Sequence, residues 1–361
     1  MVTSQRLSRR RWLALAAAGA LSGCGTMGPT TVQRDRADYA EVLGRTWKEQ
    51  TLMNVVKLRY ADVPVYLEVA SIISSTSLES QVNVAATNFD RLSTGNNQLI
   101  GAYGRYTDRP TITYSPVGGE RFARYLLRPL SPTAVFGLVQ GGYPVDRVLQ
   151  LTTRAINGVS NRSAASGRAR AADPEFPALM EAMRRVQRSE SMGTRVERRN
   201  GDEVATLFFR PDPPANVADD MRTVQRLLGL RSGARDLSLI FGPVPRSDSE
   251  IALLTRSMAE ILLEIAATIE APEADVREGR AQPAPPPATE APPWGEPLVR
   301  IHSSKHRVDD AYASVLYRGH WFWLDDRDLP SKTMFTFLLV LLSMAEAGNS
   351  AQAPVITVPA N

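Results

Sequence analysis

The chain has 361 residues, of which 43% are hydrophobic and 22% are charged, a balance typical of a folded protein with a sizeable core. Four of its 42 basic residues fall in residues 1–23, which contain no acid, so the rest of the chain carries 38 basic and 38 acidic residues and is neutral. A neutral chain has no basic excess to neutralise phosphates, and nucleic-acid binding is therefore not expected.

Residues 1–23 have the layout of a secretory signal peptide. Four arginines precede a short apolar run at 12–21, which is too short to cross a bilayer as a helix. The run ends in Leu21-Ser22-Gly23-Cys24, which resembles a bacterial lipobox and contains the only cysteine of the chain. We therefore predict that Cys24 is lipidated and becomes the first residue of the mature protein. A lone cysteine also excludes an intramolecular disulfide.

Two export routes fit these residues equally well. The stretch Ser8-Arg9-Arg10-Arg11-Trp12-Leu13 resembles a twin-arginine signal, and an ordinary basic region explains it as well. Gly25, rather than Asp, follows the cysteine, which in the enterobacterial sorting pattern favours the outer membrane. We expect an outer-membrane lipoprotein that faces the periplasm. Residues 24–36 are predicted to be an extended polar tether of up to roughly 40 Å.

The main body is predicted for residues 37–272, beginning with a helix and several strands. A four-residue spacing of apolar side chains predicts a helix over 38–60. Alternating patterns predict strands over 64–74 and 80–87, and a hairpin over 97–116 that turns at Thr107-Asp108-Arg109-Pro110.

The middle of the chain is predicted to be mainly helical. Residues 119–157 show helical patterns broken at prolines and glycines, and a polar loop follows at 161–175. Helices are predicted at 176–190 and near 216–229. Between them, the strong turn signal Asn200-Gly201 predicts a hairpin with VATLFF as its return strand.

The strongest helical pattern is SDSEIALLTRSMAEILLEIAATIE, residues 247–270. Ser247 and Glu250 have capping-box spacing, and apolar residues repeat at intervals of three and four from Ile251 to Ile269. A single long helix is predicted, and an ordinary core face is favoured over a partner-binding seam.

The end of the chain contains a linker and a second folded segment. Residues 273–297 are rich in proline and alanine and are predicted to be an extended linker or surface loop. Residues 298–348 are predicted to form a ββα unit packed on or near the main body, and 349–361 a tail. Helices and short antiparallel strands are mixed without strict alternation, so the predicted fold class is α+β.

The ββα unit can be predicted residue by residue. A two-residue turn between Tyr317 and His320 places Phe322 on one face of a hairpin, and Trp321 and Trp323 on the other. Because both faces are apolar, we predict that the hairpin is covered on both sides. A buried helix that begins at Ser331 is the predicted cover on one side.

Three acids follow the hairpin where the chain enters this helix. Asp325, Asp326 and Asp328 complement the positive end of the helix dipole, so a structural role is favoured for them.

The same region contains all three histidines, His302, His306 and His320. With an aspartate these are the residue types of a metal site. However, four residues along a strand separate His302 from His306 by about 13 Å, so no metal is predicted.

A sugar site is the other hypothesis for this region. Trp321 and Trp323 could stack on sugar rings while Asp325 and Asp326 accept protons from hydroxyl groups. In the periplasm, peptidoglycan and lipopolysaccharide sugars are the available ligands.

Standard catalytic signatures are absent from the sequence. It has no phosphate-binding loop, no GxSxG, no HExxH, and no thiol nucleophile once Cys24 is lipidated. A pair of glycosidase carboxylates cannot be singled out among the acids. No cofactor is expected.

Four stretches resemble a family of uncharacterised bacterial, mainly proteobacterial, envelope lipoproteins. They are residues 56–72, 154–162, 239–266 and 298–346, and the resemblance covers nearly the whole mature chain. It implies an envelope location and carries no activity, so no catalytic residue is transferred.

Two functions remain as expectations. The favoured one is a non-enzymatic, lipid-anchored protein that binds an envelope partner or scaffolds an envelope assembly. The alternative is an envelope glycan-binding protein or hydrolase that uses the histidine and tryptophan region.

Overall fold

A computed structural model describes residues 29–73, 76–86, 98–108, 111–116, 118–164, 170–199, 202–283 and 296–347. The predicted signal peptide, the lipobox with Cys24, the turn residues Asn200 and Gly201, most of the proline-rich segment and the tail at 349–361 lie outside these ranges. The fold class is α+β, as predicted.

The largest sheet of the described chain has the strand order β6-β5-β10-β9-β8-β7. Neighbouring strands are antiparallel except β9 and β10, which are parallel. Pairing of Arg199 with Asp202 confirms the hairpin predicted around Asn200-Gly201. The strands are β5 (Thr153–Ile156), β6 (Val159–Ser160), β7 (Met192–Arg199), β8 (Asp202–Phe209), β9 (Asp236–Phe241) and β10 (Glu250–Thr255).

Helices pack around this sheet and confirm the helical predictions for the middle of the chain, except that the end of the region predicted over 119–157 forms strand β5. Phe136, Leu149 and Phe176 are fully buried between these helices and the sheet. Ser131 caps the second of the helices, because its hydroxyl accepts a hydrogen bond from the Ala134 amide at 3.1 Å. The helices are α3 (Gly119–Leu127), α4 (Pro132–Gln140), α5 (Val145–Thr152), α6 (Glu175–Arg188) and α7 (Ala215–Leu227).

The single long helix predicted over 247–270 is wrong in its first half. The run EIALLT forms β10, and helix α8 (Met258–Ala267) begins only after it. The capping box is therefore not at Ser247 and Glu250 but at Ser257 and Glu260. A short continuous apolar run fits a central strand as well as a buried helix, so periodicity alone cannot distinguish them.

The N-terminal helix is longer than predicted. Helix α2 runs from Pro29 to Arg59, so residues 29–36 are helical and the predicted extended tether is wrong there. The C-terminal part of α2 enters the core, where Leu52 and Val55 are fully buried. No helix in the described ranges is both long enough and apolar enough to span a bilayer.

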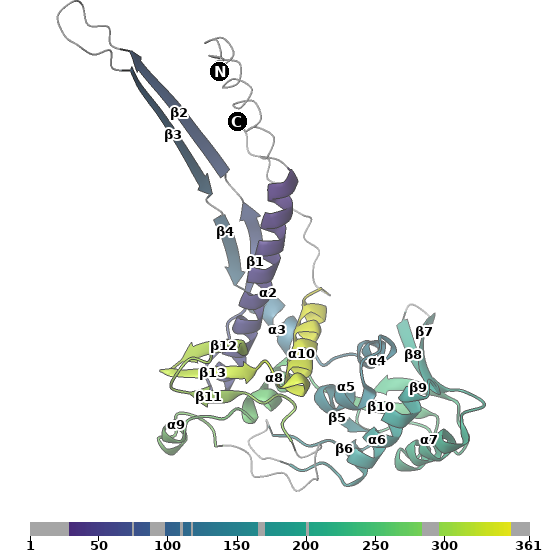
Figure 1. Cartoon of the computed structure of the whole chain (residues 1–361). Coiled ribbons are helices and arrows are strands. Elements are labelled where there is room, and N and C mark those ends of the chain that lie inside the picture. The colour runs from purple at the N-terminus through teal and green to yellow at the C-terminus, as the bar shows by residue number, and fades with distance from the viewer. Residues whose placement is uncertain are drawn as a thin grey trace, which may run out of the picture.

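A two-stranded antiparallel ribbon, here called the arm, rises from the body beside α2 (Figure 1). Strands β2 and β3 pair with each other from Thr76–Asp108 to Ala86–Gln98, and β1 and β4 pair with each other below them. The hairpin predicted to turn at residues 107–110 is therefore wrong, because β3 and β4 both continue along the arm. The strands are β1 (Leu67–Ile73), β2 (Thr76–Ala86), β3 (Gln98–Asp108) and β4 (Thr111–Pro116).

The root of the arm is attached to α2 by side-chain hydrogen bonds. Asn54 is buried and bonds both backbone groups of Val65, at 2.8 and 2.9 Å. Gln50, one turn earlier, donates to the carbonyl oxygen of Leu67 at 3.4 Å. These bonds fix the direction in which β1 leaves the body.

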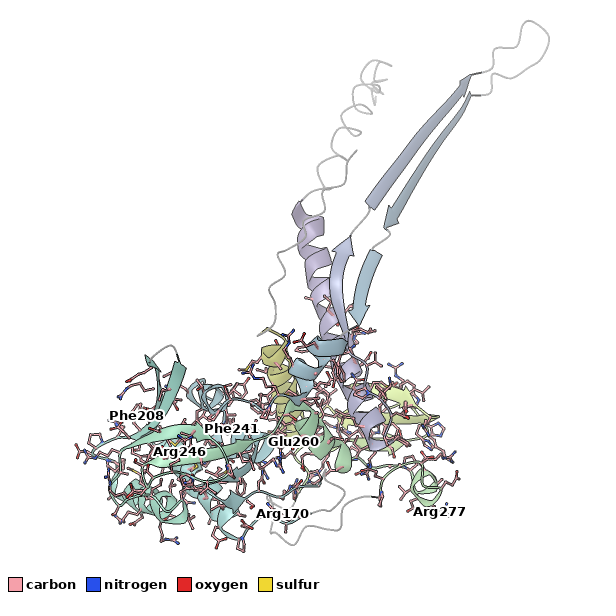
Figure 2. The ribbon with its side chains drawn as sticks, turned by 180° about the vertical axis from the view of Figure 1, so that it is seen from behind. Arg170, Phe208, Phe241, Arg246, Glu260 and Arg277 are labelled. Atoms are coloured by element: carbon pink, nitrogen blue, oxygen red, sulfur yellow. The ribbon has the colours of Figure 1, made fainter. Side chains whose placement is uncertain are left out.

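The C-terminal segment forms a three-stranded sheet with the order β11-β13-β12, followed by a helix. Phe322 and Phe335 from this segment lie in the same core cluster as Leu52 and Phe136, so it is not a separate body. The elements are α9 (Glu273–Arg277), β11 (His302–Ser304), β12 (Ala311–Tyr317), β13 (His320–Asp325) and α10 (Leu329–Ala347). Helix α9, which carries Arg277 at the edge of the body in Figure 2, occupies the start of the predicted linker.

Candidate functional site

The predicted register of the C-terminal hairpin is confirmed. Tyr317 pairs with His320 across the turn, and Phe322 pairs with Val315. Arg318 and Gly319 form the turn, both with positive φ, of 48° and 80°, as a two-residue hairpin turn requires.

The inner face of this sheet belongs to the core. Phe322 and Leu324 are fully buried, and Ala313 and Val315 beside them are almost fully buried. The ring of Phe322 meets that of Tyr60, the residue directly after α2, edge to face, with centroids 6.1 Å apart.

The outer face is not covered as predicted. Leu316 is 52% exposed, and Trp321 and Trp323 are each only half-buried. The helices α2 and α10 contact the sheet, but they leave this face partly open to solvent. Alternation in a strand fixes which residues share a face, whereas the cover on that face comes from distant parts of the chain.

Part of the predicted ligand-binding set does gather on the outer face. Pairing of β11 with β13 puts His302 opposite Trp323, and their rings lie 4.9 Å apart at 36°. His302 Nδ1 also lies 3.0 Å from the Glu270 carboxylate, which is 61% exposed. The guanidinium of Arg307 lies over the ring of Trp321, 5.4 Å from its centroid.

The three histidines do not form one site. Because side chains alternate along β13, His320 shares a face with Phe322, whereas His302 is on the face of Trp323. His306 follows β11, and its backbone carbonyl accepts a bond from the Ser304 hydroxyl. Among the described residues, no group of three or more His, Cys, Asp or Glu is arranged to hold a metal ion.

The acids after the hairpin are engaged in the turn and the helix start, as predicted. Asp328 caps α10, since its carboxylate accepts bonds from the amide and the hydroxyl of Ser331 at 3.2 and 2.7 Å. Asp326 bonds the ammonium group of Lys332 at 2.7 Å.

Asp325 is held in the charged form. A bond from the backbone N–H of Arg327, and a second from its guanidinium, lower the pKa of Asp325 below its usual range. Asp325 follows Trp323 in the alternation, so it lies on the outer face of the sheet.

A polar network that the sequence did not indicate joins α2, α9 and β12. Tyr60 is buried and donates a hydrogen bond to the buried carboxylate of Asp275 at 2.7 Å. Burial, and then the bond to Asp275, raise the pKa of Tyr60 well above its ordinary value of 10.0. Tyr317 and Arg318 both bond the carboxylate of Asp62 on the other side of the Tyr60 ring. These contacts connect the C-terminal sheet to the end of α2.

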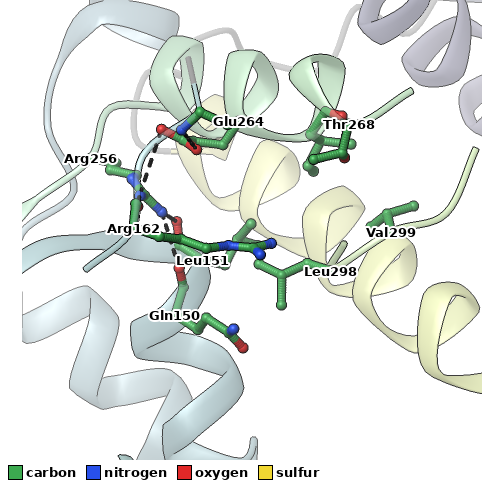
Figure 3. A pocket seen from close by; sticks show the side chains of 10 residues that line it. Gln150, Leu151, Arg162, Arg256, Glu264, Thr268, Leu298 and Val299 are labelled. Atoms are coloured by element: carbon green, nitrogen blue, oxygen red, sulfur yellow. Dashed lines mark hydrogen bonds and ion pairs between the residues drawn. The ribbon is translucent and has the colours of Figure 1, made fainter. Parts of the chain in front are cut away.

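A second polar cluster surrounds a small cavity between α5, α8 and the segment before β11 (Figure 3). The buried guanidinium of Arg256 donates to the carbonyl oxygens of Gln150, Leu151 and Arg162 at 2.6 to 3.0 Å. It also lies 3.7 Å from the carboxylate of Glu264.

The dimensions of this cavity limit what it can bind. Its volume is about 20 Å³, room for roughly one water molecule, whereas small-molecule sites usually measure about 300–1,000 Å³. The Oε1 atom of Gln150 is buried beside it without a hydrogen-bond partner among the described residues. The cluster therefore suits a structural water that completes the bonding of Gln150, rather than a substrate.

The side chains on the outer face of the C-terminal sheet are suited to ligand binding. The outer face combines two half-buried indole rings, an imidazole and two carboxylates, which can stack on and hydrogen-bond a ligand. No serine or threonine there is paired with a histidine as a nucleophile and base would be, within the described ranges. No family model, curated protein or solved structure matches this chain.

Proposed function

We propose that this chain is a lipid-anchored protein of the bacterial cell envelope that has no catalytic role and serves as a binding or scaffolding component of an envelope assembly. The lipobox at 21–24 and the glycine after Cys24 support an anchor in the outer membrane on its periplasmic side.

The observation that carries the scaffolding role is the arm. Strands β2 and β3 pair through eleven residues, and no other described helix or strand packs extensively against them (Figure 1). An isolated two-stranded hairpin is at best marginally stable in water. A ribbon of this length on a well-packed body is therefore suited to contact something outside the chain.

Lipidation is tested first. Metabolic labelling with a fatty acid should mark the wild-type chain, and Cys24→Ser should remain an unlipidated precursor. Normal labelling of Cys24→Ser would contradict the proposed anchor.

The scaffolding role is tested by site-specific photo-crosslinking in the native envelope. A crosslinkable residue at Gln81, in β2, should yield a defined adduct. The control position is Val244, which is 66% exposed on the six-stranded-sheet side of the body and should yield none. Equal adducts at both positions, or none at Gln81, would count against the role of the arm.

Glycan binding is the second candidate, favoured by the half-open face that carries Trp323, His302 and Glu270. Peptidoglycan or lipopolysaccharide should bind the wild-type protein, and Trp323→Ala should abolish binding while the fold is intact. Trp47→Ala is the control, because Trp47 is a 36% exposed tryptophan on α2 and is not part of the outer face of the β11-β13-β12 sheet. If the wild-type protein binds no glycan, the candidate fails.

A further inference from the structure

The two faces of the arm differ in composition. The register pairs Leu78 with Tyr106, Val82 with Ala102 and Val84 with Ile100. Because side chains alternate along a strand, these positions share one face, and that face carries no charge from Leu78 to Ala86.

The opposite face is polar along most of its length. It contains Glu79 paired with Arg105 and Gln81 paired with Tyr103, and Asn83 follows at the next position. Only the pair Ala85–Leu99, at the far end, is apolar. One mainly apolar, uncharged face and one mainly polar face along the same hairpin form the pattern of strands that separate a lipid phase from water.

The length of β2 and β3 matches a bilayer. Each has 11 residues, and a strand that spans a membrane needs about 9–11 when tilted. At ~3.4 Å per residue the ladder is about 37 Å long, and a tilt of ~45° gives a height of about 26 Å. The apolar band of membrane-spanning strands is about 25 Å tall.

The first described residue of α2 lies near the level at which β2 begins (Figure 1). Gln50 of α2 is hydrogen-bonded to Leu67 of β1, so these two residues lie at the same height above the body. From that height, α2 and β1 both rise to the same side of the body (Figure 1). From Gln50 to Pro29 the helix rises about 32 Å at ~1.5 Å per residue. From Leu67 to Ile73, β1 covers about 20 Å at ~3.3 Å per residue, and β2 begins three residues further on.

From these observations we infer that β2 and β3 insert into the lipid bilayer as a hairpin, beginning at the level where the acyl chains on Cys24 enter it. The inference rests on the envelope location and the lipid anchor proposed above. Backbone groups at an open strand edge cannot remain unpaired in lipid. The edges of β2 and β3 therefore pair with the arms of further copies of this chain, in a closed ring whose polar face lines the inside.

The test uses alternate positions on one strand. Single cysteines replace Val82 and Val84 on the apolar face, or Gln81 and Asn83 on the polar face, in the full lipidated chain. Each cysteine carries an environment-sensitive fluorophore, and the proteins are reconstituted in phosphatidylethanolamine–phosphatidylglycerol vesicles. Positions 82 and 84 should shift to the blue and be quenched by nitroxide-labelled acyl chains. Positions 81 and 83 should remain accessible to a water-soluble quencher.

Arginine substitutions test the energetics of bilayer insertion. They are made in the chain that carries the fluorophore at Val84→Cys. Val82→Arg should reduce the inserted fraction by about 30-fold or more, since arginine on the lipid face is strongly disfavoured at mid-bilayer. Gln81→Arg changes the neighbouring residue, which is on the polar face, and should therefore change the inserted fraction little. An equal loss in both variants would contradict the assignment of the faces.

The remaining outcomes separate this inference from the proposed function. Water-exposed labels at all four positions overturn insertion, even where the intact mass shows acyl chains on Cys24. Labels shielded at 82 and 84 without nitroxide quenching overturn it too, and identify a protein partner instead. A chain without acyl chains that still shows the alternating pattern refutes the lipid anchor but not insertion.

Discussion

The sharpest stability test compares the two faces of the C-terminal sheet through Phe322→Ala and Trp323→Ala. Phe322 has no exposed surface and packs edge to face on Tyr60, so its truncation leaves a cavity that the surrounding helices cannot close. Such changes cost about 3–5 kcal/mol. Trp323 is half-buried and keeps one ring contact, with His302, so we expect a loss of about 1–2 kcal/mol from its removal.

The measurement is urea unfolding at 25 °C, followed by far-ultraviolet circular dichroism on the chain from residue 25 onward. Circular dichroism is chosen because removing a tryptophan changes the fluorescence signal itself. Leu316→Ala, at a position 52% exposed, is the control and should change stability by less than about 1 kcal/mol. If Trp323→Ala costs as much as Phe322→Ala, the outer face is covered and the description of the site is wrong.

Three further predictions concern the rest of the body. Ser257→Ala should cost about 0.5–2 kcal/mol, because it removes the α8 capping box, whereas Ser247→Ala should cost less than about 0.5 kcal/mol by urea unfolding. Burial raises the pKa of Tyr60, so its contribution to stability is full below pH 10, the ordinary tyrosine value, and is lost as pH rises toward its folded-state pKa. Tyr60→Phe should therefore be less stable than wild type at pH 8, by about 1–3 kcal/mol, since buried Asp275 loses a donor, and its stability should fall less steeply above pH 10. Arg256→Met should cost about 3–5 kcal/mol at neutral pH, and a loss below 1 kcal/mol would show that its three carbonyl bonds contribute little.

The features of the fold that depend on neighbouring residues, such as turns, hairpin register and helix caps, could be predicted from the sequence. The turn between Tyr317 and His320 fixes the pairing of every later residue in the hairpin, since register follows from the turn. The same reasoning gave the hairpin between Arg199 and Asp202. The Asp328 cap follows from residue type and from its place before a helix.

The features that depend on residues far apart in the sequence could not be predicted. The spacing Ser-x-x-Glu occurs at 247–250 and again ten residues later at 257–260, and only the position of β10 between β5 and β9 decides which of these two caps a helix. Likewise, the prediction that both faces of the C-terminal sheet are covered holds for the inner face and only in part for the outer one, because an apolar face does not specify what packs on it.

The arm is a case in which a local turn signal led to a wrong prediction. A turn signal at residues 107–110 outweighed an alternation that runs through both 76–86 and 98–108, although the longer pattern fixes the pairing. Comparing those two stretches residue by residue would have found the ribbon, because Val82, Val84 and Ala85 in one stretch each have an apolar partner in the other. A hairpin that none of the other described helices and strands supports needs support from outside them, and the uncharged face of the arm indicates that this support is apolar.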